Sequence, residues 1–146
     1  MNNYSPLSIN GPILIIEDDA DDRYIFDQVF KELEIASRVK YFINAVNAMT
    51  FLKEDPTQPF IIICDINLPI MNGLEFKKEI DQDEHLRAKS IPFVFFSTSI
   101  EKKTVEEAYR KLTIQGYFQK SSDYEELKRR LYSILDYWQH CQHPNQ

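Results

Sequence analysis

The residues best suited to chemistry are acidic side chains that end runs of apolar residues. Asp65 directly follows residues 60–64 (FIIIC), and Glu17 and Asp18 follow residues 13–16 (ILII). Uninterrupted apolar runs of this length are typical of strands that are buried on both faces of a parallel sheet. Ligands bind to such sheets outside the carboxyl ends of the strands. We therefore expect Asp65 to be the chemical centre of the protein.

Two further predicted strands also end in reactive side chains. Ser97 and Thr98 follow residues 92–96 (PFVFF), and Lys120 follows residues 114–119 (IQGYFQ). In a parallel sheet the carboxyl ends of all strands lie along one edge. We therefore expect these hydroxyl and ammonium groups to share one crevice with the acidic residues.

Together these groups predict an aspartyl-phosphate site. Carboxylates held close together repel one another unless a cation relieves the repulsion, and Mg²⁺ prefers such oxygen ligands beside a phosphate. Lys120 supplies a compact positive charge, and Ser97 supplies a hydrogen-bond donor. Asp65 would attack the phosphorus atom, while Mg²⁺ and the Lys120 ammonium balance the negative charge of the transferring phosphoryl group.

Each of these residues also has an ordinary structural explanation. An aspartate after a strand often caps a helix, and acidic residues often begin one because they favour the positive end of its dipole. A lone lysine is usually a solvated side chain. The predicted convergence of four separate strand ends favours the functional interpretation.

The elements that must position these residues alternate along the chain. Helical spacing of apolar residues begins at Ala20, after the capping residue Asn44, at Gly73, and around 105–112. A last helix is expected after residues 122–125, which have capping-box spacing, and the charged segment 81–89 is expected to be a helix end and a loop. Strands are expected at 13–16, 39–43, 60–64, 92–96 and 114–119.

This alternation predicts an α/β fold with a doubly wound, five-stranded parallel sheet. The right-handed crossover rule and the strand count favour the flavodoxin-like (βα)5 arrangement with strand order 2-1-3-4-5. We expect a short leader at 1–11, one domain at 12–139 and a polar tail at 140–146. A chain of 146 residues with 43% hydrophobic residues can form one sizeable core.

Composition excludes several classes of function. A net charge of −6 argues against direct binding to nucleic acid or to an anionic membrane. No apolar run is long enough to span a membrane, and residues 1–11 do not resemble a signal peptide. Two cysteines, Cys64 and Cys141, form no disulfide framework, and Cys64 is expected to be a buried filler. We therefore expect a cytoplasmic protein.

The C-terminal part leaves two questions open. Segment 140–143 (HCQH) includes three possible metal ligands, although chance explains three such residues in a chain terminus more simply. Tyr132, Tyr137 and Trp138 either extend a surface for a partner or a homodimer, or complete the core.

Order and spacing of these motifs resemble the response-regulator receiver domain over residues 12–138. The resemblance implies that Asp65 accepts a phosphoryl group from a phosphohistidine on a sensor histidine kinase or a histidine phosphotransfer protein. The matching segments are 13–19 (ILIIEDD), 63–73 (ICDINLPIMNG), 95–99 (FFSTS) and 116–120 (GYFQK).

The resemblance also implies roles for the other site residues. Asp18 would bind Mg²⁺ directly, Glu17 mainly through water, and Asn67 through its backbone carbonyl. Ser97 matches the family's switch hydroxyl, which moves toward the phosphoryl group. Lys120 matches the family's lysine. Tyr117 matches the switch aromatic residue, whose ring would rotate inward on activation. The surface formed by the fourth predicted helix, the fifth strand and the last helix would then change for an unknown downstream protein.

Two positions depart from the family pattern. Ser121 stands where the family usually has a proline, often preceded by a cis peptide bond, so the loop before the last helix is expected to differ. Thr98 is larger than the small residue usually found after the switch hydroxyl, and we expect it to slow the loss of the phosphoryl group. We expect no output domain after the last helix, and in this the chain resembles the stand-alone receivers that work with kinases and phytochrome-type sensors.

Three alternatives use the same kind of fold. A phosphohydrolase of the haloacid-dehalogenase type needs a carboxylic acid at position 67, where this chain has Asn67. A flavin- or nucleotide-binding module needs a phosphate loop rich in glycine, whereas the chain has three glycines in all and acidic residues after its first strand. The third is a receiver that docks to partners without being phosphorylated.

Overall fold

The predicted sheet is present in the computed structural model, which describes residues 4–144. All neighbouring strands pair in parallel, and their order is β2-β1-β3-β4-β5, so the predicted fold class is confirmed. The strands are β1 (Ile13–Ile16), β2 (Val39–Phe42), β3 (Ile61–Cys64), β4 (Phe93–Ser97) and β5 (Gly116–Gln119).

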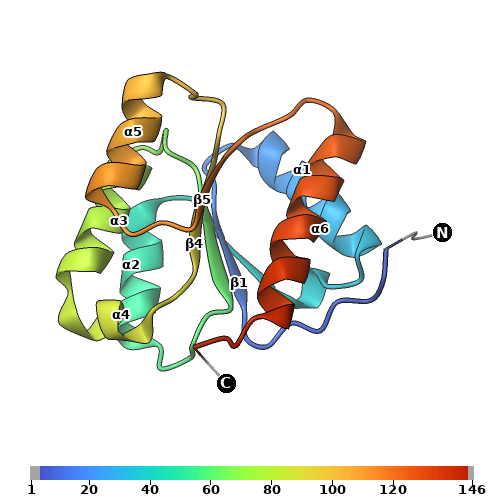
Figure 1. Cartoon of the computed structure of the whole chain (residues 1–146), viewed down its shortest axis with the longest axis horizontal. Helices are drawn as coiled ribbons and strands as arrows, with labels where there is room; N and C mark the ends of the chain where they lie inside the picture. Colours follow the sequence, from blue (N-terminus) through green and yellow to red (C-terminus); the bar gives the residue numbers. More distant parts are fainter. Residues whose placement is uncertain (1–3, 145–146) are drawn as a thin grey trace.

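Helices cover both faces of the sheet (Figure 1). One face carries α1 (Ala20–Glu32) and α6 (Tyr124–His140), and a single 3-10 turn (Ala36–Arg38) precedes β2. The opposite face carries α2 (Ala45–Glu54), α3 (Gly73–Gln82), α4 (Glu84–Lys89) and α5 (Lys102–Lys111).

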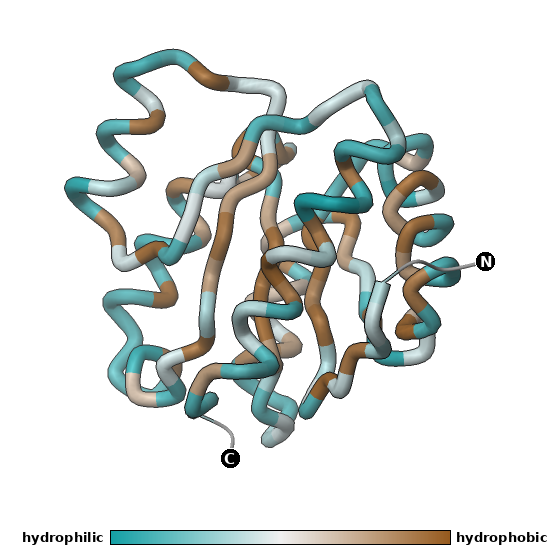
Figure 2. Tube along the Cα trace, turned by 45° about the vertical axis from the view of Figure 1, so that its right-hand side comes forward, coloured by the Kyte–Doolittle hydropathy of each residue, from teal (hydrophilic) through white to brown (hydrophobic). Residues whose placement is uncertain are grey.

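Successive residues of each central strand point into different cores. In β1, Leu14 and Ile16 pack toward the α2–α3 side, whereas Ile13 and Ile15 pack toward α1 and α6. Both faces are therefore apolar, which explains why the strands read as continuous hydrophobic runs. Figure 2 shows this as apolar strands in the interior and hydrophilic stretches on the outer helices.

The segment 81–89 differs from its predicted form. It completes α3 and then forms the separate short helix α4, so the prediction of a loop here is wrong. The Asp83 side chain accepts a hydrogen bond from the Leu86 N–H at 3.0 Å and caps α4. Leu86 is buried in the core, which anchors a helix that is otherwise charged.

The start of α6 also differs from the prediction. Asp123, and not Ser122, caps the helix by accepting a hydrogen bond from the Glu126 N–H at 3.2 Å. The hydroxyl of Ser121 accepts a hydrogen bond from the Asp123 N–H at 3.1 Å. The helix cap therefore lies one residue later than the capping-box pattern indicated.

Segments near both ends of the chain pack against the domain. The Tyr132 hydroxyl donates to the Ser5 carbonyl at 3.0 Å, and the Ser8 N–H donates to Gln139 at 2.7 Å. The His143 ring is buried and stacks on Phe60, with ring centroids 4.8 Å apart. This residue of segment 140–143, whose possible metal ligands we attribute to chance, is thus held against the core. Among the described residues, no helix is long and apolar enough to cross a membrane.

Gly73 lies where α3 begins and where the chain passes closest to Asp65. A Cβ atom on Gly73 would lie 2.3 Å from the Asp65 carbonyl oxygen and 3.0 Å from the Ile66 Cα. The Gly73 N–H also donates to the Ile66 carbonyl at 2.8 Å. The absence of a side chain at this position lets the helix start directly beneath the residue that follows β3.

We predict that Gly73→Ala lowers the free energy of unfolding by about 1–3 kcal/mol, because backbone atoms cannot move aside as a side chain can. Urea unfolding measures the loss. Gly116→Ala is the matched control, since its nearest contact is a ring carbon of Phe118 at 2.9 Å, and a ring can turn. Equal losses in the two variants would contradict the importance of the Asp65 backbone contact.

Candidate functional site

The four predicted strand ends meet at one edge of the sheet. The register aligns Ile16 with Cys64, so Glu17 and Asp65 leave neighbouring strands side by side. The Asp65 N–H donates to the Ile16 carbonyl at 3.1 Å, which continues the sheet pairing by one residue. On the other side, the Lys120 N–H donates to the Ser97 carbonyl at 2.9 Å.

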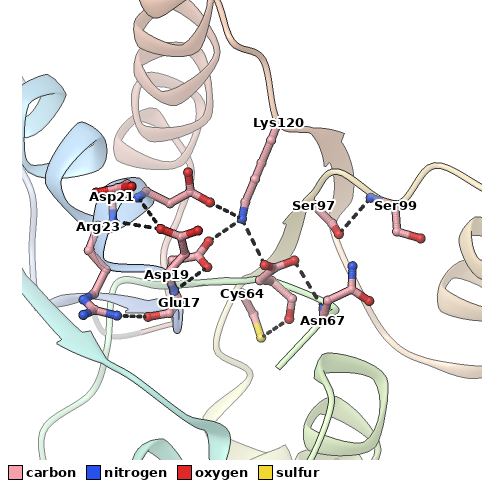
Figure 3. Close-up of polar contacts among 11 residues, drawn as sticks. Glu17, Asp19, Asp21, Arg23, Cys64, Asn67, Ser97, Ser99 and Lys120 are labelled. Atoms are coloured by element: carbon pink, nitrogen blue, oxygen red, sulfur yellow. Dashed lines mark hydrogen bonds and ion pairs between the residues drawn. The ribbon is translucent and has the colours of Figure 1, made fainter. Parts of the chain in front are cut away.

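The ammonium group of Lys120 is the centre of the site (Figure 3). Its Nζ lies 2.5 Å from Glu17 Oε1, 2.9 Å from Asp65 Oδ2 and 2.9 Å from Asp22 Oδ2. The Glu17 and Asp65 side chains are only 2% and 8% exposed, whereas that of Asp22 is 35% exposed. One cation thus contacts three carboxylates in a mostly buried position.

Burial shifts the pKa values of this group. It raises the pKa of Glu17 to about 7, because the ionised carboxylate loses its water, and Lys120 offsets only part of that loss. The pKa of Lys120 is raised by its carboxylate partners despite burial, so the ammonium stays charged. The site therefore holds a fixed cation and an acid that titrates near neutral pH.

Three acidic side chains at this edge could hold a metal ion. Glu17, Asp18 and Asp65 each place an oxygen within 4.8 Å of the others, and Asp18 is exposed at the mouth of the site. The Asn67 N–H donates to Asp65 Oδ1 at 3.3 Å, so the loop after β3 folds back on this carboxylate. An all-oxygen set with an open side fits Mg²⁺, which keeps several waters when it binds to proteins.

The two predicted switch residues lie on adjacent strands. Ser97 is fully buried, and its hydroxyl accepts a hydrogen bond from the Ser99 N–H at 3.1 Å. Tyr117 is half-buried, its ring lies 5.9 Å from that of Phe95, and its hydroxyl donates to the Ser99 carbonyl. Both side chains thus hold the start of the loop between β4 and α5.

Sequence reasoning missed two residues of this site. Asp22 is not among the predicted site residues, yet it pairs with Lys120. No local signal in the sequence separates it from its neighbour Asp21. Arg23 donates to the Glu17 carbonyl at 2.8 Å and so fixes the end of β1. Asp19, the third acidic residue after β1, caps α1.

The two departures from the family pattern lie beside Lys120. Asp22, Thr98, Lys120 and Ser121 all line a cavity of about 580 Å³ that adjoins the site. Among residues 4–144 there is no cis peptide bond, so the bond between Lys120 and Ser121 is trans. The Ser121 hydroxyl donates to Glu126 at 3.1 Å, which ties this loop to α6.

Comparison with known proteins agrees with the geometry. Residues 13–132 match the model of the response regulator receiver domain. A curated relative, the response regulator Rcp1 of Synechocystis, is 30% identical over 131 residues, which cover 86% of this chain and 87% of Rcp1.

Solved structures give the same result. The phosphorylated cyanobacterial phytochrome response regulator RcpA superimposes with a TM-score of 0.81 at 26% identity, covering 92% of this chain and 99% of RcpA. The Mn²⁺-bound form of Rcp1 gives a TM-score of 0.75 at 27% identity, covering 90% of this chain and 96% of that structure. The chain belongs to the response-regulator receiver domains of two-component signalling.

Proposed function

We propose that this protein is a single-domain response regulator of a phosphorelay, with Asp65 as its phosphoacceptor. The observation that carries the proposal is the position of Lys120 Nζ, 2.5 Å from Glu17 and 2.9 Å from Asp65, beside an oxygen-rich group that includes Asp18. The phosphodonor is a phosphohistidine on a sensor histidine kinase or a histidine phosphotransfer protein. The crystal structures of phosphorylated RcpA and of Mn²⁺-bound Rcp1 support this assignment by similarity.

Phosphoryl transfer requires a nucleophile and charge balance. A carboxylate oxygen of Asp65 attacks the phosphorus atom, and the phosphorus–nitrogen bond breaks with its electron pair going to the imidazole of the donor. Lys120 then donates a hydrogen bond to a phosphoryl oxygen, because its ammonium already lies at Asp65. Mg²⁺ held by Glu17, Asp18, Asp65 and the Asn67 carbonyl supplies further positive charge when it is bound.

The phosphoryl group also provides the signal. It adds negative charge and acceptor oxygens at Asp65, which attract the Ser97 hydroxyl. In the structure, the Ser97 hydroxyl accepts a hydrogen bond from the Ser99 N–H, and the Tyr117 hydroxyl donates a hydrogen bond to the Ser99 carbonyl. Movement of Ser97 therefore disturbs both contacts, frees Tyr117 to turn inward, and shifts the surface of α5, β5 and α6 for a downstream protein. Any self-catalysed phosphorylation or dephosphorylation is slow.

Replacement of Asp65 tests the proposal directly. With Mg²⁺ and acetyl phosphate, we expect the protein to gain one phosphoryl group and Asp65→Ala to gain none, as measured by intact mass. Asp21→Ala should gain the group normally, because the carboxylate that it removes forms no hydrogen bond or ion pair with any described residue. If the unaltered protein gained nothing at any Mg²⁺ concentration, the protein would instead be a receiver that acts by docking alone.

Mg²⁺ affinity should depend on pH. An acid with a pKa of about 7 is mostly protonated below that pH, and a neutral Glu17 attracts a cation less strongly. We predict that lowering the pH from about 8 to about 6 weakens the apparent affinity roughly tenfold, as measured by calorimetric titration. Glu17→Gln should bind more weakly and lose this dependence, while a flat profile in the unaltered protein would refute the prediction.

Thr98 should slow the loss of the phosphoryl group. Its side chain is exposed and lines the cavity beside Lys120, where it restricts the approach of water. We predict that Thr98→Ala loses the group about threefold faster, a change of roughly 0.7 kcal/mol in the barrier. Thr50→Ala is the control, because Thr50 lies on α2 and bonds only within that helix. An unchanged or longer lifetime of phosphorylated Thr98→Ala would exclude this role.

A further inference from the structure

The role of Asp22 follows from the donor count of Lys120. An ammonium group has three N–H donors, and Lys120 has three carboxylate partners, which come from Glu17, Asp22 and Asp65. Asp65 is the proposed phosphoacceptor and Glu17 belongs to the proposed metal group. Asp22 belongs to neither, since it extends from α1 and lies outside the group of metal-ligating side chains.

Asp22 is also the partner that Lys120 releases most easily. Its side chain is 35% exposed, against 2% for Glu17 and 8% for Asp65. A carboxylate that leaves Lys120 must be rehydrated or find another partner, and only an exposed one can regain water without a change in the fold. A phosphoryl oxygen arriving at Asp65 therefore competes with Asp22 for the ammonium.

We propose that Asp22 is a positioning residue that acts through Lys120, by holding the ammonium partly away from the transferring phosphoryl group and slowing phosphorylation. The inference rests on the proposed function of Asp65. The Asp22 carboxylate draws the ammonium toward α1, at 2.9 Å from its Oδ2, and the same distance separates the ammonium from Asp65. Removing that charge leaves Lys120 free to follow the developing charge on the phosphoryl oxygens.

The chain offers a matched control in Asp21. It lies beside Asp22 in the first turn of α1, and both backbone N–H groups donate to Asp19, at 2.8 Å for Asp21 and 3.2 Å for Asp22. The Asp21 carboxylate forms no hydrogen bond or ion pair with any residue in 4–144. Asp21→Asn and Asp22→Asn therefore change the net charge and the helix start equally, but only the second removes a charge from Lys120.

The experiment measures the rate of phosphorylation by acetyl phosphate at saturating Mg²⁺, using intact mass. In this reaction Asp65 attacks phosphorus, the bond between phosphorus and the acetate oxygen breaks, and acetate leaves with the electron pair. We expect Asp22→Asn to react about threefold faster than the unaltered protein, the size expected for one partly exposed ion pair. Asp21→Asn should react at the unaltered rate, and Asp22→Glu, which keeps the charge, should restore slow phosphorylation.

A second donor separates competition for Lys120 from simple repulsion of the donor. Phosphoramidate carries less negative charge than acetyl phosphate, and Asp22→Asn should accelerate both reactions by the same factor. Acceleration with acetyl phosphate alone, or equal acceleration by Asp21→Asn, would overturn the inference, as would a slower Asp22→Asn. Asp22→Ala provides a second variant, with thermal unfolding as the test of folding.

Failure of the two proposals gives different results. If the unaltered protein gains no phosphoryl group from either donor, the assignment of Asp65 fails. If it gains the group, but Asp22→Asn and Asp22→Ala fold and react at the unaltered rate, only the role of Asp22 fails.

Discussion

The structure of this protein depends on one crowded set of charges at the carboxyl edge of its sheet. Lys120 follows β5, yet its ammonium reaches carboxylates that follow β1 and β3 and one on α1. Buried carboxylates are costly without a partner, so the cation that neutralises them also joins these elements. Burial disfavours the ionised form of Glu17 and Lys120 offsets only part of that cost, which explains why the pKa of Glu17 is raised here. A divalent cation is the natural complement of such an edge.

The elements that carry the strand-end residues could be predicted from the sequence. Residues 13–16 and 60–64 are apolar because both faces of β1 and β3 are covered, and such a run is typical of a central strand in a parallel sheet. The parallel pairing of β1 with β3 then places Glu17 beside Asp65, and the pairing of β4 with β3 and β5 brings Lys120 to the same edge. The family resemblance added the expected metal-binding role of the Asn67 carbonyl and the expected switch roles of Ser97 and Tyr117, which neither spacing nor composition could supply.

Other features could not be predicted, for physical reasons. Helix α4 is short and charged, and its single buried anchor, Leu86, gives no periodic pattern. The pairing of Asp22 with Lys120 joins residues 98 positions apart, and nothing local to Asp22 distinguishes it from Asp21. Tyr132 was open to two interpretations, and its hydroxyl bonds within the chain, to Ser5, whereas Tyr137 is exposed. Long-range polar contacts depend on the folded geometry and leave little trace in sequence.

Gly73 has a consequence for anyone who wishes to redesign this site. It is eight positions along the chain from the proposed nucleophile and contributes no reactive group. A mutant library that keeps only the chemically reactive residues constant would therefore randomise it. Its missing side chain nevertheless sets how closely α3 approaches the Asp65 carbonyl, because any Cβ would lie 2.3 Å from that oxygen. A directed-evolution scheme that diversifies the loop after β3 should therefore keep residue 73 fixed and treat it as part of the active centre.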